Sequence, residues 1–99
     1  MGFIYKINCN QNGKAYIGLT NISIEHRWQG HINAAITPSH PDYNFPIHRA
    51  MRKYGIEAFT IEMLEEIDNG NLLKEREKYW ISYYDSYNSG YNATLGGDG

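Results

Sequence analysis

The chain has 99 residues, the size of one ordinary domain and enough to bury a single hydrophobic core. Its formal net charge is −2, so it lacks the excess of cations common in proteins that hold nucleic acid through phosphate contacts. A single cysteine, Cys9, excludes an intrachain disulfide and favours a reducing compartment, and no stretch is apolar enough for a secretory signal or a membrane span. We therefore expect a cytoplasmic protein with no membrane partner.

A β-hairpin is expected at the start of the chain. Residues 3–9 and 14–19 are rich in β-branched and aromatic side chains, and the Asn-Gly dipeptide at 12–13 favours a turn with positive φ. A loop of two residues and a loop of four residues both fit this pattern. Either register places Tyr5 and Tyr16 on the same face of the sheet, because side chains alternate along a strand.

The first helix is expected from Ser23, a plausible N-cap, to about residue 36, where a Thr-Pro pair stops it. Arg27 and His31 lie one turn apart, on the shoulder of its apolar stripe. Such a cation pair is either part of a site or an ordinary solvated edge. The apolar stripe consists of Ile24, Trp28, Ile32 and Ala35.

A loop over residues 37–43 carries His40 and precedes a second helix, predicted over 44–54 with Pro46 in its first turn. Alternating apolar and polar residues then predict a third strand near 58–66. The middle of the chain also carries much of the positive charge, in Arg27, Arg49, Arg52 and Lys53.

The last helix is predicted from about residue 70 to 84. Glu77 lies within its apolar stripe, whereas Glu75 projects to the far side. A buried, unpaired carboxylate costs several kcal/mol, so Glu77 needs a cation, a network of donors or a metal; a salt bridge to Arg27 or Arg76 would also suffice. The stripe consists of Leu73, Trp80, Ile81 and Tyr84.

These polar residues suit phosphodiester hydrolysis. One carboxylate with oxygen-rich neighbours is typical of Mg²⁺, which keeps several waters and takes substrate phosphate as a ligand. Arginine fits two phosphate oxygens, and histidine or tyrosine can move a proton at the attacking water. Zinc is a poor alternative, because the residues that could ligate it show none of the close paired spacings of structural zinc sites. Those residues are Cys9, His26, His31, His40 and His48.

Six short motifs, in order, resemble those of the GIY-YIG nuclease family, above all the catalytic domains of phage and intron-encoded homing endonucleases. The resemblance covers nearly the whole chain and departs at Phe3, where the family's first motif has glycine. It implies an α+β fold, with a small antiparallel sheet of about three strands flanked by three helices. The motifs are "FIY" at 3–5, "AYIG" at 15–18, "HRWQGH" at 26–31, "RKYG" at 52–55, "EREKYW" at 75–80 and "GYN" at 90–92.

The resemblance also implies roles for individual residues. Tyr5 and Tyr16 would position or deprotonate the attacking water, with Gly18 allowing close backbone approach, and the sequence does not choose between the two tyrosines. Arg27 would hold the scissile phosphate and stabilise its added charge. His31 would assist proton transfer or bind phosphate, and as an ordinary imidazole it would put a limb near pH 6.5 on the rate profile.

Further positions complete the implied site. Glu77 would carry one divalent cation, Mg²⁺ or in its place Mn²⁺, and Asn92 would support the site. His40 matches a loop histidine of some family members, and Arg49 joins Gly18 and Arg27 as a residue expected to contact substrate.

The resemblance thus implies a metal-dependent DNA endonuclease that cuts double-stranded DNA by direct attack of water, in a bacterial or phage-infected cell. Residues 1–95 would form the catalytic domain, and 96–99 would begin a linker to a separate DNA-binding region. Two alternatives stay open: a non-catalytic nucleic-acid-binding module, and a structure-specific or repair nickase. The sequence also leaves the oligomeric state open, with a monomer as one option.

Overall fold

The computed structural model describes residues 1–96 and confirms an α+β domain with a three-stranded antiparallel sheet and three helices. The strands are β1 (Gly2–Cys9), β2 (Ala15–Thr20) and β3 (Phe59–Ile67), in the spatial order β2-β1-β3. The helices are α1 (Ile24–Ile36), α2 (Pro46–Tyr54) and α3 (Leu73–Tyr84). Short 3-10 helices occupy Ile56–Ala58 and Gly70–Leu72.

The hairpin adopts the four-residue loop, one of the two predicted alternatives. Tyr5 lies opposite Gly18, and Ile7 lies opposite Tyr16. Gly13 in the loop has a φ of 74°, a left-handed conformation that glycine adopts without strain. Tyr5 and Tyr16 share one face of the sheet, with their ring centroids 6.3 Å apart, as side-chain alternation predicts.

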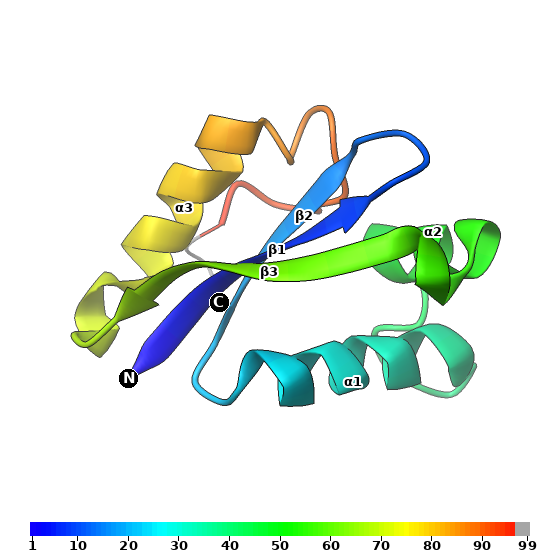
Figure 1. The fold of residues 1–99 in the computed structure, drawn as a ribbon, viewed down its shortest axis with the longest axis horizontal. Coiled ribbons are helices and arrows are strands. Elements are labelled where there is room, and N and C mark those ends of the chain that lie inside the picture. Colours follow the sequence, from blue (N-terminus) through cyan, green and yellow to red (C-terminus); the bar gives the residue numbers. More distant parts are fainter. Residues whose placement is uncertain (97–99) are drawn as a thin grey trace.

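Helices cover both faces of the sheet. Figure 1 shows α3 on one side, and α1 and α2 on the other. Central strand β1 therefore buries consecutive side chains on opposite faces: Ile4 packs towards α3 and Tyr5 towards α1 and α2, and both are 0% exposed. The core under α3 is formed by Ile4, Ile17, Ile67, Leu73 and Ile81. The larger core under α1 and α2 includes Tyr5, Ile7, Cys9, Ala35, Ile47, Ala50, Met51 and Phe59.

Helix α1 has the predicted bounds but a different rotation about its axis. Ser23 caps it, because its hydroxyl oxygen accepts a hydrogen bond from a backbone N–H of the first turn. The prediction that His31 lies on the shoulder of the apolar stripe is wrong: His31 is buried together with Ala34 and Ala35. Burial is tolerated because both ring nitrogens of His31 are hydrogen-bonded. The predicted stripe residues Ile24, Trp28 and Ile32 are only half-buried.

The other two helices begin slightly later than predicted. Helix α2 starts at Pro46 instead of residue 44, since Phe45 is extended and proline suits the first helical position. The chain before α3 first forms a 3-10 turn, capped by the Asn69 side chain, and becomes α-helical at Leu73. On α2, His48 is buried beside the predicted apolar residues.

The segment after α3 returns along the outer edge of β2. Tyr91 donates its backbone N–H to the Ala15 carbonyl at 2.9 Å, and the Asn92 side chain continues the pairing at Ile17. In Figure 1 this orange-red segment lies beside β2. It covers backbone groups that an edge strand would otherwise expose. The expected linker at 96–99 lies, beyond Gly96, outside the described residues.

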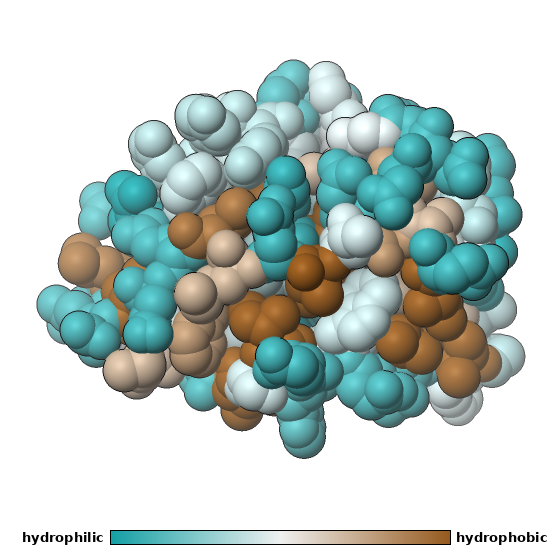
Figure 2. Space-filling view, in the orientation of Figure 1, coloured by the Kyte–Doolittle hydropathy of each residue, from teal (hydrophilic) through white to brown (hydrophobic). Residues whose placement is uncertain are grey.

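The face of the molecule seen in Figure 2 carries separate apolar patches divided by hydrophilic side chains. No helix within residues 1–96 combines the length and the apolar character needed to cross a membrane.

Candidate functional site

Tyr5 is fully buried beside Tyr16, and Gly18 makes room for it. A Cβ atom at Gly18 would lie 2.3 Å from both Cζ and the hydroxyl oxygen of Tyr5, closer than real Cβ contacts come. The phenol therefore lies directly over the Gly18 backbone. The family resemblance implied a close approach to the backbone at Gly18, and in this structure the approaching group is Tyr5.

A chain of short hydrogen bonds leads from Tyr5 into the core under α1 and α2. The Tyr5 hydroxyl lies 2.7 Å from Nε2 of His31, and Nδ1 of His31 lies 2.8 Å from Nε2 of His48. The chain ends at the backbone carbonyl of Asp42, 2.7 Å from Nδ1 of His48. Tyr5, His31 and His48 are each at most 2% exposed, so this is a buried polar network with its donors and acceptors paired.

Burial and positive charge keep both histidines neutral. Loss of solvent lowers the pKa of His31 to about 3, with further contributions from Arg27 and His48. Burial also lowers the pKa of His48, against the hydrogen bond to the Asp42 carbonyl, which raises it. The limb near pH 6.5 expected for an ordinary imidazole is therefore not expected from His31 in this environment.

The two tyrosines have different surroundings. Burial raises the pKa of Tyr5 well above its usual range, and the neighbouring Tyr16 raises it further. Burial also raises the pKa of Tyr16; the guanidinium of Arg27 lowers it again, and the carboxylate of Glu77 raises it. Arg27 therefore lies close enough to favour the phenolate of either tyrosine.

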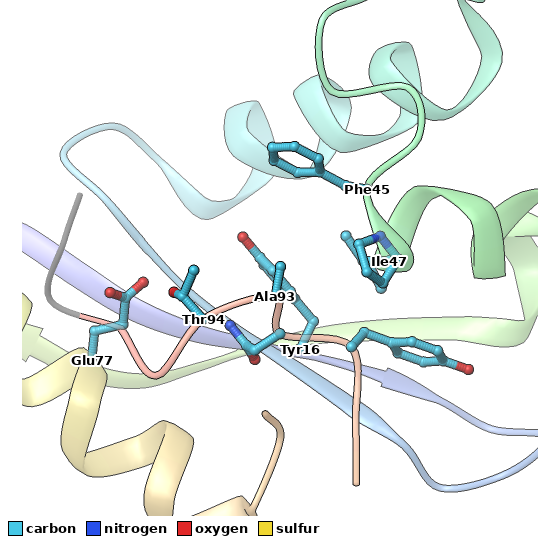
Figure 3. A pocket seen from close by; sticks show the side chains of 9 residues that line it. Tyr16, Phe45, Ile47, Glu77, Ala93 and Thr94 are labelled. Atoms are coloured by element: carbon cyan, nitrogen blue, oxygen red, sulfur yellow. The ribbon is translucent and has the colours of Figure 1, made fainter. Parts of the chain in front are cut away.

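Tyr16 and Glu77 face a common cavity of about 300 Å³. Figure 3 shows both side chains at the cavity, together with Phe45, which directly precedes α2, and Ile47 of α2. Glu77 is half-buried whereas Glu75 is exposed, which agrees with the helical phase predicted for the two acids. The lining consists of Tyr16, Phe45, Pro46, Ile47, Glu77, Tyr91, Asn92, Ala93 and Thr94.

Asn92 holds the C-terminal segment against β2. Its side-chain oxygen accepts from the Ile17 N–H at 2.8 Å and from the Ser86 hydroxyl at 2.6 Å, while its amide nitrogen donates to the Ile17 carbonyl at 2.8 Å. The carboxamide thus takes the place of a neighbouring strand. Asn92 therefore lies in the cavity wall and fastens it to β2.

The residues at the cavity fit a hard divalent cation. Glu77 contributes a carboxylate, and Tyr16 and Thr94 contribute hydroxyls, all of them oxygen ligands. Within the described part of the chain, no three His, Cys, Asp or Glu side chains gather closely enough to hold a metal ion among them. The donor set therefore suits an ion that is held by one carboxylate and completes its shell with water and phosphate oxygens.

Three predicted side chains belong neither to the cavity lining nor to the hydrogen-bond chain behind it: Arg27, which is half-buried on α1, His40 and Arg49. His40 is half-buried in the loop after α1, where its Nδ1 accepts the Asp42 N–H at 3.0 Å. Arg49 is exposed and lines an adjoining groove of about 350 Å³. The cavity and the groove share Pro46 and Tyr91, so the two form neighbouring hollows on one side of the molecule.

Sequence reasoning missed His48. Its position beside the apolar stripe of α2 was the available signal, but the same position is common for solvated polar residues. Only the approach of α2 to α1 shows that it meets His31.

Comparison with known proteins places the chain clearly. A model of the GIY-YIG catalytic domain matches residues 1–92. Intron-associated endonuclease 1 of Enterobacteria phage T4 is 34% identical over 97 residues, which are 94% of this chain and 38% of that protein. The putative MSV199 domain-containing protein 146R of Invertebrate iridescent virus 6 is 32% identical over 90 residues, 89% of this chain and 35% of that protein. The chain thus spans less than half the length of either relative.

Solved structures agree with this placement. The catalytic domain of the intron endonuclease I-TevI superposes with a TM-score of 0.81 at 31% identity, over 95% of each chain. A second structure of the catalytic domain of homing endonuclease I-TevI gives a TM-score of 0.80 at 30% identity, over 95% of this chain and 99% of that one.

Proposed function

The chain belongs to the GIY-YIG catalytic domain family, and from this premise we propose that it is the catalytic part of a metal-dependent endonuclease that hydrolyses double-stranded DNA by direct attack of water. The observation that carries the proposal is the cavity where the β2 tyrosine, Tyr16, meets the α3 carboxylate, Glu77. A proton carrier and a cation ligand then face the same substrate-sized space.

Glu77 is proposed to hold the divalent cation, Mg²⁺ or Mn²⁺, at the cavity wall. When bound, such an ion supplies positive charge that neutralises phosphate oxygens and orients the substrate. Arg27 supplies further positive charge beside the tyrosines, where charge develops on the phosphate during attack.

Tyr16 is the tyrosine proposed to meet the attacking water. It is half-buried and lines the cavity, whereas Tyr5 is 0% exposed and lies behind it. Tyr5 and His31, which are buried behind Tyr16, would then receive the proton that Tyr16 takes from the water. Tyr16 is chosen over Tyr5 because it is accessible from the cavity, and a general base must reach the proton that it removes.

The adjoining groove is proposed as the path of the DNA backbone next to the scissile phosphate. Lys14, Arg49 and Lys53 line it, all three are exposed, and none forms an ion pair within residues 1–96. This is a small set of cations on a chain of net charge −2. We expect weak, non-specific DNA binding, with a Kd of about 10⁻⁴ to 10⁻⁶ M at physiological salt. Target recognition would then belong to another part of the protein, outside residues 1–95.

The decisive experiment is plasmid nicking at high enzyme concentration with Mg²⁺ or Mn²⁺, comparing Glu77→Gln with Glu75→Gln. Glu77→Gln removes the charge from the cavity and should lower the rate at least about 1,000-fold, since metal-assisted charge stabilisation contributes several kcal/mol. Glu75 is the matched control because it lies two residues away on the exposed side of the same helix.

Cleavage by Glu77→Gln at the wild-type rate would contradict the assigned ligand. Metal-independent DNA binding without any nicking would instead favour a non-catalytic module. A panel of duplex, flap and branched substrates distinguishes a nuclease of linear duplex from a structure-specific nickase.

A further inference from the structure

The hydrogen-bond chain behind the cavity has a defined direction because it ends on a carbonyl. The Asp42 carbonyl can only accept, so Nδ1 of His48, 2.7 Å away, carries a hydrogen and donates it. In neutral His48 the other nitrogen, Nε2, is then a bare acceptor. It lies 2.8 Å from Nδ1 of His31, which must therefore be the donor.

The Tyr5 hydroxyl is the donor at the other end of the chain. Neutral His31 has its hydrogen on Nδ1, so its Nε2 is bare and accepts the hydroxyl hydrogen of Tyr5 at 2.7 Å. The lowered pKa of each histidine agrees with this neutral arrangement. Every bond in the chain thus points from Tyr5 through the histidines towards Asp42.

We propose that His48 is the terminal proton acceptor of this site: it holds His31 in the tautomer that accepts from Tyr5, and it receives the His31 Nδ1 proton when His31 takes the Tyr5 proton. The inference rests on the proposed function, because the proton originates at the water that attacks DNA. His48 touches neither substrate nor reacting atoms and is therefore a positioning and relay residue.

The transfer balances without another reactant. The Tyr5 O–H bond breaks and a bond to His31 Nε2 forms; the His31 Nδ1–H bond breaks and a bond to His48 Nε2 forms. Tyr5 regains a proton from Tyr16, its neighbour at the cavity, and Tyr16 takes one from the water that becomes the attacking hydroxide. The net result is one proton moved from water to His48, with His31 and both tyrosines restored to neutral forms.

His48 is a better final position for the positive charge than His31. Charge on His31 is opposed by burial, by Arg27 and by His48. Around His48, burial, Arg27 of α1 and His40 of the loop also oppose it, but Asp42 favours it through both its carbonyl and its carboxylate. The positive charge thus ends on the histidine that Asp42 stabilises, and not on His31, where Arg27 opposes it.

The position of His48 is well defined. Its side chain is 2% exposed on α2, and the Phe45 ring stacks against it at 5.9 Å with the planes 3° apart. Packing and two hydrogen bonds hold the imidazole in the orientation that relay requires.

Two substitutions separate positioning from relay. His48→Gln retains an oxygen that can accept the His31 Nδ1–H but has no basic nitrogen, whereas His48→Leu removes both functions. His26→Gln is the control, because His26 is an exposed histidine on α1 that takes no part in the hydrogen-bond chain. For each variant we would record thermal unfolding, long-range ¹H–¹⁵N spectra of the histidine rings, and single-turnover nicking from pH 4.5 to 8.5.

His48→Gln is expected to keep the hydrogen on His31 Nδ1 and to nick about 100-fold more slowly than wild type, the contribution of one proton-transfer group. In its pH–rate profile, the fall in rate towards acid pH should move to lower pH, because protonation of His48 no longer removes the proton acceptor. Wild-type rate and pH profile in a folded His48→Gln would overturn the relay. A wild-type spectrum with the hydrogen on His31 Nε2 would overturn the positioning role, even if the wild type does not cleave and the proposed function fails separately.

Discussion

The two faces of the sheet bury different kinds of side chain. Under α3 the buried core residues are all aliphatic, with isoleucines from all three strands and Leu73 and Ile81 of the helix, and Trp80 and Tyr84 pack against them. Under α1 and α2 the core contains Tyr5, His31 and His48, joined by hydrogen bonds. Central strand β1 contributes to both.

This difference separates stability from chemistry. Aliphatic burial contributes about 25 cal/mol for each Å² removed from water, with no geometric requirement beyond packing. A buried polar network contributes little net stability but fixes the orientation and protonation of its members. We infer that the aliphatic core under α3 supports the fold and holds the helix that carries Glu77, while the polar network under α1 and α2 prepares the tyrosines.

The sharpest test of this division is to remove aliphatic volume from the core under α3 at a residue that does not line the cavity. Ile67→Ala in β3, at the opposite edge of the sheet from β2, should lower the free energy of unfolding by about 2–5 kcal/mol. Urea unfolding measures this loss. Nicking per folded molecule should match wild type, and a slower rate at a temperature where the variant is fully folded would contradict the division.

Substitution of Arg27 should lower the cleavage rate and leave stability largely unchanged. Arg27→Ala is expected to slow single-turnover cleavage about 100-fold or more while weakening DNA binding much less, because charge that grows on the phosphate is stabilised only in the transition state. Arg27→Lys should recover only part of the rate, since ammonium lacks the planar fork. Equal losses in binding and rate would instead assign Arg27 to ground-state binding.

A substitution at Gly18 tests whether the core under α1 and α2 tolerates an added methyl group beside Tyr5. Gly18→Ala places Cβ against the Tyr5 phenol, so it should lower the free energy of unfolding by about 1–3 kcal/mol and displace the hydroxyl from His31. Thermal unfolding and the nicking rate report the two effects. Gly70→Ala is the matched control, because nothing lies within 4 Å of its added Cβ.

Acid should lower the free energy of unfolding through His31, in the core under α1 and α2. The pKa of His31 is about 3 when folded and about 6.5 when unfolded, so the unfolded chain binds the additional proton between these values. Its contribution to stability is present above pH 6.5 and is lost as the pH falls, by about 2 kcal/mol between pH 7 and pH 5. His31→Gln, which still offers Tyr5 an acceptor, should flatten this dependence in urea unfolding measured across pH.

Much of the fold follows from local patterns. The turn dipeptide and strand alternation predicted the hairpin and the shared face of Tyr5 and Tyr16, and helical phase separated Glu77 from Glu75. Ser23 and Pro46 marked the starts of α1 and α2 to within two residues. Each of these signals acts over a few residues, so no knowledge of distant contacts was needed.

The hairpin register, the burial of His31 and the participation of His48 depended on packing. Two loop lengths satisfied the same turn chemistry, and the paired strands adopt the one that seats Tyr5 over Gly18. A histidine beside an apolar stripe is solvated or buried according to what the neighbouring helix offers it. Here α2 and the Asp42 carbonyl offer hydrogen-bond partners that offset desolvation, and such partners come from segments that the helix's own sequence does not contain.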